Sequence, residues 1–416
     1  MANARTWRRE HARRSPLATF QAPPRPGMTG MLHTIPRWAR REAHQVYRRV
    51  QRRLGRQLAY RTVTGLQRVV LNQGRTLQTG NLVVPWRDVH RAVLVLVIYG
   101  YMDRDRLMKG PVRATSAILG ILTACLGAEL RRVRLRTGMC RLYRRTPQFW
   151  FAGADGHRSD LQRLSTLGGK RMLANFFAVR RRREWREQVQ QHDLLVALDS
   201  GGYQAWLQGS ELDFGAWAAF VSGHQDLLVW YVQPDQPGAG VEVNRGYLLR
   251  SEQLGLTPTP TFHIDMPLDY LTWLLDRGYP YIAIGGHTRI KDEKARRARI
   301  REIQVRIRKQ AADHVLGSMN LEESSSCDAG TWTRARAGRS VWTPLGRVKV
   351  AHGEIPWDEL TSLAILQIVG WQEQVASGTA QLSFPVDVVA RCGSEFVQAA
   401  WCRPVPTQQQ LRIVGL

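Results

Sequence analysis

The stretch LLVALDSGGYQ, residues 194–204, decides how this sequence folds. Its apolar residues predict a buried strand that delivers Asp199 to its end, and Gly201 and Gly202 then allow the backbone to turn sharply. Similar short apolar runs follow at residues 227–232, 260–264 and 281–284. Amphipathic helical stretches separate them, and this alternation predicts consecutive βα units. We therefore expect an α/β fold, and the length suits a (β/α)8 TIM-type barrel.

Residues able to do chemistry follow two of these runs, where barrel enzymes place their functional groups. Tyr203 and Gln204 add a flat ring and an amide beside Asp199. The run YIAIGGHT, residues 281–288, ends in a glycine pair whose backbone groups can read a planar ligand. Taken singly, the aspartate also fits a structural cap and the glycine pair an ordinary turn.

A third motif is SSSCDAGTWTRARAG, residues 324–338. Asp328 stands among small residues, and Arg334 and Arg336 follow it. Nearby arginines keep a carboxylate ionised, as a nucleophile requires. A solvated loop carboxylate is the alternative.

In this order, the three motifs resemble the tRNA-guanine transglycosylase superfamily over about residues 148–345. Those enzymes are (β/α)8 barrels that exchange guanine for a 7-deazaguanine through a covalent glycosyl-enzyme intermediate. The sequence is most similar to the phage and genomic-island branch that modifies DNA. PTFH at residues 260–263 and DAGTW at residues 328–332 stand where that branch has a PxxH strand end and its nucleophile loop.

The resemblance implies a role for each motif residue. Asp328 would attack C1′ and displace guanine, while Asp199 would be the general acid/base. Asp235 would bind the Watson–Crick edge of guanine, on position and strand context alone, and His263 fits either a substrate contact or a structural role. The other implied contacts to the base are Tyr203, which would stack on it, and Gln204, Gly201, Gly202, Gly285 and Gly286.

The cysteines depart from the pattern of the tRNA enzymes, which carry a Cys-x-Cys-x-x-Cys…His zinc site after the nucleophile loop. The five cysteines of this chain are widely spread, with no such spacing. We therefore expect no zinc and no other cofactor, and tRNA becomes a less suitable substrate than DNA. Unpaired, scattered cysteines also favour a reducing compartment, the cytoplasm of a bacterium or a phage-infected cell.

Charge points to a polyanionic partner. Sixty Lys and Arg against 34 Asp and Glu give a net charge of +26 and a pI near 11.0. Nucleic acid is the favoured partner, DNA first and RNA second, and an anionic membrane surface is the alternative. No apolar run has the roughly 18 residues of a membrane span. The incoming base would be a 7-deazaguanine such as a preQ0-type precursor, and accessory proteins are further expected partners.

Three domains are expected. Residues 1–60 form a basic arm with a helix at residues 36–58, whose apolar face holds Trp38, Val46, Val50 and Leu54. Residues 84–147 read as helices at 86–101, 103–108 and 115–128 and then an arginine-rich hairpin, which resembles the winged helix-turn-helix family. Its predicted nucleic-acid contacts are Arg113, Thr115, Arg132, Arg134, Arg136, Arg141 and Arg144, joined by Arg334 and Arg336 from the barrel. A winged helix can also dock proteins. Residues 148–416 form the barrel with a closing C-terminal segment.

The sequence thus predicts a basic DNA guanine transglycosylase. An RNA-directed enzyme of the same chemistry is one alternative. A non-catalytic nucleic-acid-binding protein with a degenerate barrel is the other, although the chain keeps both Asp199 and Asp328.

Overall fold

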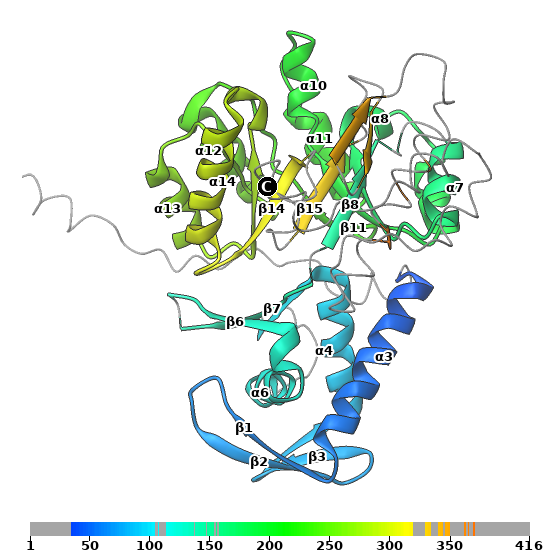
Figure 1. The fold of residues 1–416 in the computed structure, drawn as a ribbon, viewed down its shortest axis with the longest axis vertical. Coiled ribbons are helices and arrows are strands. Elements are labelled where there is room, and N and C mark those ends of the chain that lie inside the picture. Colours follow the sequence, from blue (N-terminus) through cyan, green and yellow to red (C-terminus); the bar gives the residue numbers. More distant parts are fainter. Residues whose placement is uncertain are drawn as a thin grey trace, which may run out of the picture.

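The structure is a computed structural model in which two units can be described (Figure 1). The N-terminal unit covers residues 35–144, and the α/β unit begins at residue 148. The described residues are 35–318 except 105, 106, 108–113, 137, 147, 154, 156 and 157, together with 329–333, 340–343, 346–349, 362, 365, 369 and 370.

The N-terminal unit opens with the predicted basic helix, α3 (Arg37–Leu54), which buries Trp38, Val46, Val50 and Leu54 on one face as expected. A four-stranded antiparallel sheet then follows, which the sequence analysis did not anticipate. Gly74 and Gly80 have positive φ and lie in the two tight turns that separate its last three strands. The strands, paired in chain order, are β1 (Gln57–Arg61), β2 (Gln67–Asn72), β3 (Thr76–Thr79) and β4 (Leu82–Pro85).

The rest of this unit matches much of the predicted element order. The apolar helix α4 (Trp86–Tyr99) ends at Gly100, whose φ of 72° is left-handed. Strand β5 (Tyr101–Asp103) includes Asp103, the first residue of the short helix expected at 103–108; of the rest of that helix, Arg104 and Leu107 are described, and both are helical. Then come α6 (Thr115–Leu126), the 3-10 turn η1 (Gly127–Glu129), β6 (Leu130–Arg134) and β7 (Cys140–Arg144), and the antiparallel sheet has the order β5-β7-β6.

The α/β unit contains eight strands whose pairings are all parallel, in the order β11-β10-β9-β8-β15-β14-β13-β12. They are β8 (Gln148–Ala152), β9 (Arg171–Asn175), β10 (Leu195–Asp199), β11 (Leu228–Tyr231), β12 (Thr261–His263), β13 (Tyr281–Gly285), β14 (Ala312–Ser318) and β15 (Ala329–Thr333). The four predicted strands correspond to β10, β11, β12 and β13. The expectation of an α/β fold is confirmed.

Helices follow most of these strands in the chain. The apolar faces of the helices pack against the sheet. They are α7 (Arg158–Thr166), α8 (Phe176–Val179), α9 (Trp185–Gln191), α10 (Gly202–Leu207), α11 (Phe214–Gly223), α12 (Gly240–Gln253), α13 (Leu268–Asp276), the 3-10 turn η2 (His287–Arg289) and α14 (Glu293–Ile307). A separate two-stranded hairpin, β16 (Ser340–Thr343) and β17 (Gly346–Lys349), lies later in the chain.

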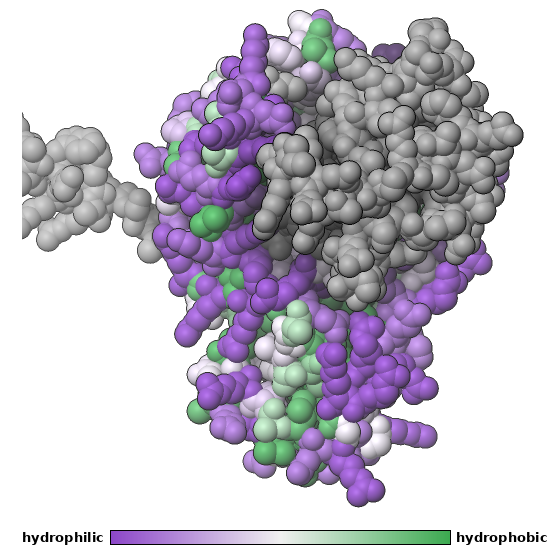
Figure 2. All heavy atoms as spheres, viewed as in Figure 1, coloured by the Kyte–Doolittle hydropathy of each residue, from purple (hydrophilic) through white to green (hydrophobic). Residues whose placement is uncertain are grey.

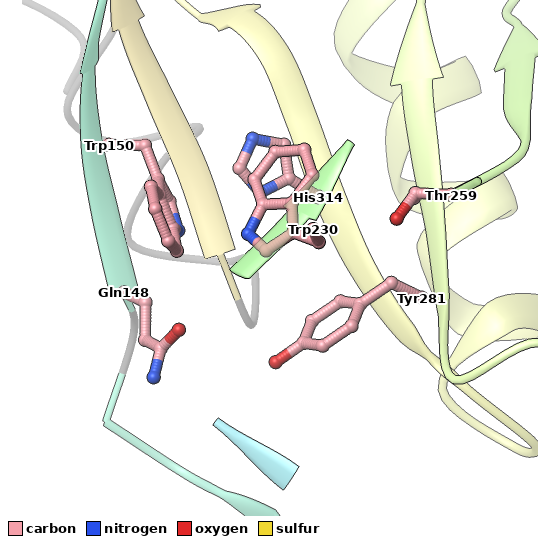
Figure 3. Close-up of a pocket in the computed structure, with 6 residues that line it drawn as sticks. All are labelled: Gln148, Trp150, Trp230, Thr259, Tyr281 and His314. Carbon is pink, nitrogen blue, oxygen red and sulfur yellow. The ribbon is translucent and has the colours of Figure 1, made fainter. Parts of the chain in front are cut away.

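The parallel sheet is strongly curved. Its edge strands are joined by a parallel bridge between Val232 and Thr259, just beyond β11 and just before β12. Trp230 of β11 meets Trp150 of β8 edge-on at 5.1 Å between ring centroids, and His314 of β14 at 4.7 Å. With Gln148, Thr259 and Tyr281, these side chains line a small pocket inside the sheet (Figure 3). Side chains from strands far apart in the sheet order therefore meet on one face of the sheet.

The N-terminal unit packs against the amino ends of the parallel strands. Arg171 and Tyr281, the first residues of β9 and β13, hydrogen-bond to the carbonyls of Val97 and Tyr99 at the end of α4, at 3.1 and 2.9 Å. One hydrophobic cluster runs from this unit into the sheet interior, where it includes Trp150. Figure 1 shows the unit on one side of the sheet and α10 on the other. The opposite, carboxyl edge is left for a functional site.

Within the described part of the chain, no helix combines the length and the apolar character needed to cross a bilayer. Hydrophilic residues cover most of the described surface on the face drawn in Figure 2, with smaller hydrophobic patches on the N-terminal unit.

Candidate active site at the carboxyl edge of the parallel sheet

Polar side chains from four neighbouring strands meet at the carboxyl edge. Asn175 and Asp199 are the last residues of β9 and β10, and the Asn175 side-chain amide donates to Asp199 Oδ2 at 3.3 Å. Asp235 follows β11 and accepts from the Ser200 hydroxyl at 2.7 Å. His263 ends β12, and its Nε2 lies 2.8 Å from Asp235 Oδ2. The structure thus joins Asp235 and His263, two residues that the sequence supported only weakly.

Asp199 has the electrostatic character of a proton-transfer group. Burial, followed by the nearby charge of Asp235, raises its pKa to about 7, and Asp155 adds to this effect. Hydrogen bonds from the Gly201 backbone and the Asn175 amide act in the opposite direction. A carboxyl group with a pKa near neutrality is half protonated at pH 7 and can both give and take a proton.

The glycines after β10 permit a close approach between two strand ends. Gly201 has φ 78°, and a side chain there would overlap the ring of Phe177. A Cβ on Gly202 would overlap the carbonyl oxygen of Asp235, and the Gly202 amide donates to Ser200 Oγ at 3.2 Å. Any larger residue would push Asp235 away, so the Gly-Gly pair is a packing requirement of this site.

The second glycine pair lies against the histidine. A Cβ on Gly285 would crowd the His263 ring at 3.3 Å. Gly286 has φ 78°, and a Cβ there would lie 3.2 Å from the Cβ of His263. His263 is buried, and its Nδ1 has no hydrogen-bond partner among the described residues. The predicted strand-end residues of β10, β11, β12 and β13 therefore form one continuous cluster.

Helix α10 carries the remaining predicted contacts to the base. Tyr203 is 43% exposed, whereas Gln204 is half-buried and its Oε1 has no partner among the described residues. Trp206, one turn further on, is 47% exposed, and its ring lies 5.8 Å from that of Tyr203.

Three residues of the cluster were missed by sequence reasoning. Asp155 is buried beyond β8 and accepts from the Asn175 backbone amide. Asn175 ends the run RMLAN, residues 171–175, whose apolar core followed by a polar residue is the same pattern that marked Asp199. Ser200 stood within the quoted motif, but nothing in the sequence indicated that its hydroxyl bonds to a residue 35 positions away.

Several predicted residues lie outside the described part of the chain: Asp328, Arg334, Arg336 and Arg113. Strand β15 starts one residue after Asp328, and its first residue, Ala329, pairs with Gln148 at the start of β8. The carboxyl edge follows Thr333, at the other end of β15. The pairing of β15 therefore gives no support to a nucleophile at residue 328.

The arginines of the predicted wing have other partners. Arg141 is buried, with its Nε 2.9 Å from Asp103 Oδ2, and it also donates to the carbonyls of Gly278 and Tyr279 in the α/β unit. Thr115 is buried too. Buried side chains cannot reach a phosphate backbone, so Arg141 and Thr115 leave the set of candidate contacts.

The other four wing arginines remain nearer the surface. Arg144 pairs with Glu42 at 2.8 Å and Arg136 with Asp276 at 2.5 Å, and Arg132 donates to the carbonyl of Val63. Arg134 is exposed, and no described residue pairs with it.

The face of α6 that would enter a DNA groove is covered. A Cβ on Gly120 would overlap the ring of Tyr60 and the carbonyl of Arg61 in β1. Most residues of α6 are buried, and only Ser116 and Ala124 of this helix are exposed. A helix packed in this way offers little surface for reading bases.

The described residues contain no group of three His, Cys, Asp or Glu side chains placed to hold a metal ion. Comparison with models of known protein families gives no match for this chain. Comparison with curated proteins gives none either.

Proposed function

We propose that this protein is a guanine transglycosylase that acts on DNA, exchanging guanine for a 7-deazaguanine base. The observation that carries the proposal is Asp199, a carboxyl group with a pKa near 7 held beside Asp235 at the carboxyl edge of a parallel sheet. Two neighbouring carboxyl groups with different environments suit base exchange, in which one group moves protons and another binds the base.

The proposal includes closure of the parallel sheet as a (β/α)8 barrel. Three observations support it: the eight strands follow one another around the sheet in chain order, the Val232–Thr259 bridge joins its two edges, and the Trp150, Trp230 and His314 rings meet inside. In such barrels the reaction takes place at the carboxyl edge.

Each residue of the cluster has a definite part in the proposed reaction. Asp199 protonates the departing guanine and later accepts a proton from the incoming base. Asp235, oriented by the Ser200 hydroxyl and by His263, accepts hydrogen bonds from the Watson–Crick edge of the base. The attack on C1′, which forms a glycosyl ester that the incoming base displaces, is assigned to Asp328 by the motif resemblance alone. The start of β15, one residue later, lies at the amino ends of the parallel strands.

The target base must leave its stack to reach this edge. The positive charge of the chain favours a nucleic-acid substrate, and the proposed setting is the cytoplasm of a bacterium or of a phage-infected cell. The winged-helix interpretation of α4, β5, α6, β6 and β7 is supported by their order and by the sheet order β5-β7-β6. The buried face of α6 favours a protein-docking role over DNA reading for this segment.

The test is incorporation of labelled guanine into duplex DNA, single-stranded DNA and tRNA. We compare the wild type with Asp199→Asn and Asp328→Asn. Asp276→Asn is the control, because among the described residues Asp276 forms an exposed ion pair with Arg136 and no other. Incorporation into DNA that both site variants abolish and the control keeps would support the proposal. Incorporation into tRNA alone would show that the substrate is RNA and not DNA. The proposed chemistry would be refuted if none of the three polymers showed either incorporation of guanine or a covalent adduct with the protein.

A further inference from the structure

Helix α10 presents a pair of exposed aromatic rings next to the candidate site. Among the described residues, Tyr203 and Trp206 are the most exposed Phe, Tyr or Trp side chains, at 43% and 47%; the other exposed large hydrophobic residues are aliphatic. The two rings are 5.8 Å apart and inclined by 31°. Tyr and Trp rings that are part-exposed side by side offer a flat apolar surface with polar edges, which suits a planar ligand.

The position of the pair is fixed by the site itself. Helix α10 begins at Gly202, three residues after Asp199, and its first turn is held against Asp235 by the contact that excludes a Cβ at Gly202. Figure 1 shows α10 projecting from the α/β unit on the side away from the N-terminal unit. A nucleic-acid strand that delivers a base to Asp199 has to approach the edge of the sheet at which α10 begins.

An arginine run follows the strand next to β10, while the acidic residues Glu211 and Asp213 follow α10 itself. The strand next to β10 is β9, and its helix α8 is followed by four consecutive arginines, Arg180 to Arg183. Arg180 lies over the ring of Phe177 at 4.5 Å, and that ring lies against Gly201 at the start of α10. Arg181 and Arg183 are exposed, and no carboxylate within the described part of the chain pairs with Arg180, Arg181 or Arg183.

We propose that Tyr203 and Trp206 form a stacking platform for an unpaired base that neighbours the target nucleotide, while the arginines after α8 hold the phosphates of the same strand. In this arrangement Tyr203 stacks on the neighbouring base instead of on the exchanged base, the contact that the motif resemblance implied. The platform rests on the proposed function, because it selects the nucleic acid that the site would modify. Flat rings accept every base by stacking, and guanidinium groups neutralise the backbone. The platform therefore favours single-stranded or locally opened nucleic acid over intact duplex.

An aromatic and basic surface also resembles one that binds a lipid headgroup region. The location favours nucleic acid, because the rings lie beside the carboxylates of a site suited to base chemistry. An anionic vesicle belongs in the test as the competing partner.

The test measures binding rather than base exchange, so that its outcome is independent of the proposed reaction. The full chain is titrated with a single-stranded oligonucleotide carrying 2-aminopurine, whose fluorescence falls on stacking. The variants are Trp206→Ala and Trp206→Phe, with Val305→Ala as a control, since Val305 is 61% exposed on α14 and far from α10 in sequence.

We expect Trp206→Ala to bind the single strand roughly tenfold more weakly and to lose much of the quenching, because a stacked base contributes on this scale. Trp206→Phe should restore most of both, and Val305→Ala should match the wild type. Unchanged binding and quenching in Trp206→Ala would overturn the platform. The platform would also be overturned if Trp206→Ala lost binding to anionic vesicles, with about 20% phosphatidylglycerol, while its binding to the oligonucleotide stayed at the wild-type level. If the wild type performs no base exchange but Trp206→Ala still weakens strand binding, the proposed function fails and the platform stands.

Discussion

Replacing Asp199 by Asn should stabilise the fold, and by an amount that depends on pH. An unfolded aspartate ionises near pH 3.8, whereas burial and the charge of Asp235 hold the pKa of Asp199 at about 7 in the folded state. Between these values the unfolded chain gains from ionisation while the folded protein keeps its proton, so stability falls as pH rises. At roughly 1.4 kcal/mol per pH unit, the full cost is about 4 kcal/mol above pH 7.

Asparagine carries no charge at any pH and can still accept the hydrogen bond from Asn175, so the variant avoids this cost. We expect the difference in Tm between Asp199→Asn and wild type to be small at pH 4.5, to grow steadily up to pH 7 and to stay constant above it. Differential scanning fluorimetry from pH 4.5 to 8.5 measures it, with Asp276→Asn as an exposed control whose difference should stay flat. A Tm difference for Asp199→Asn that does not change with pH would refute the assigned pKa.

Three further outcomes follow from the same contacts. Asp235→Asn removes the negative charge that helps to raise the pKa of Asp199. The limb of the pH–activity profile that reports Asp199 should therefore move to lower pH. Gly202→Ala should abolish base exchange, because the added Cβ would overlap the Asp235 carbonyl. Gly246→Ala within α12, where an added Cβ meets no other atom, should leave activity intact and add about 0.5–1 kcal/mol to the free energy of unfolding measured in urea. Arg141→Met should cost about 3–5 kcal/mol of stability by removing the charged partner of the buried Asp103 carboxylate, without changing the salt dependence of nucleic-acid binding. Arg134→Gln should reduce that dependence and spare stability. The reverse pattern in salt titrations and thermal melts would contradict the placement of these two side chains.

Much of the fold could be read from the sequence because its strongest patterns are local. Four parallel strands and several helices were predicted from apolar runs, and the arginine hairpin was found from its alternation around Gly138. Strands β8, β9, β14 and β15 were missed because their apolar runs are short or interrupted by polar residues, as in QFWFA, RMLAN, ADHVLGS and AGTWT, although Gly168 and Gly169 precede β9. The sheet β1–β4 was missed for a similar reason, since its strands are short and half polar.

The candidate site was predicted only as far as its residues follow recognisable strands. Asp199 and the glycines were found in this way, whereas the bond between Ser200 and Asp235 depends on how β10 and β11 align. The roles of the wing arginines could not be predicted because a sequence does not show which basic residues find an acidic partner. Arg141 looked like a phosphate contact, yet it is buried against Asp103 across the sheet from β7 to β5.

The way the N-terminal unit meets the parallel strands also bears on how this protein can fold and change over evolution. Tyr99 and Tyr143 belong to the same hydrophobic cluster as Trp150, Leu195 and Ala312, so one core runs through both units. A fragment starting at residue 148 would leave the aromatic interior of the sheet open to water and would tend to aggregate. The two units should melt in a single cooperative transition, and neither is free to be lost, exchanged or recombined while the other keeps its shape.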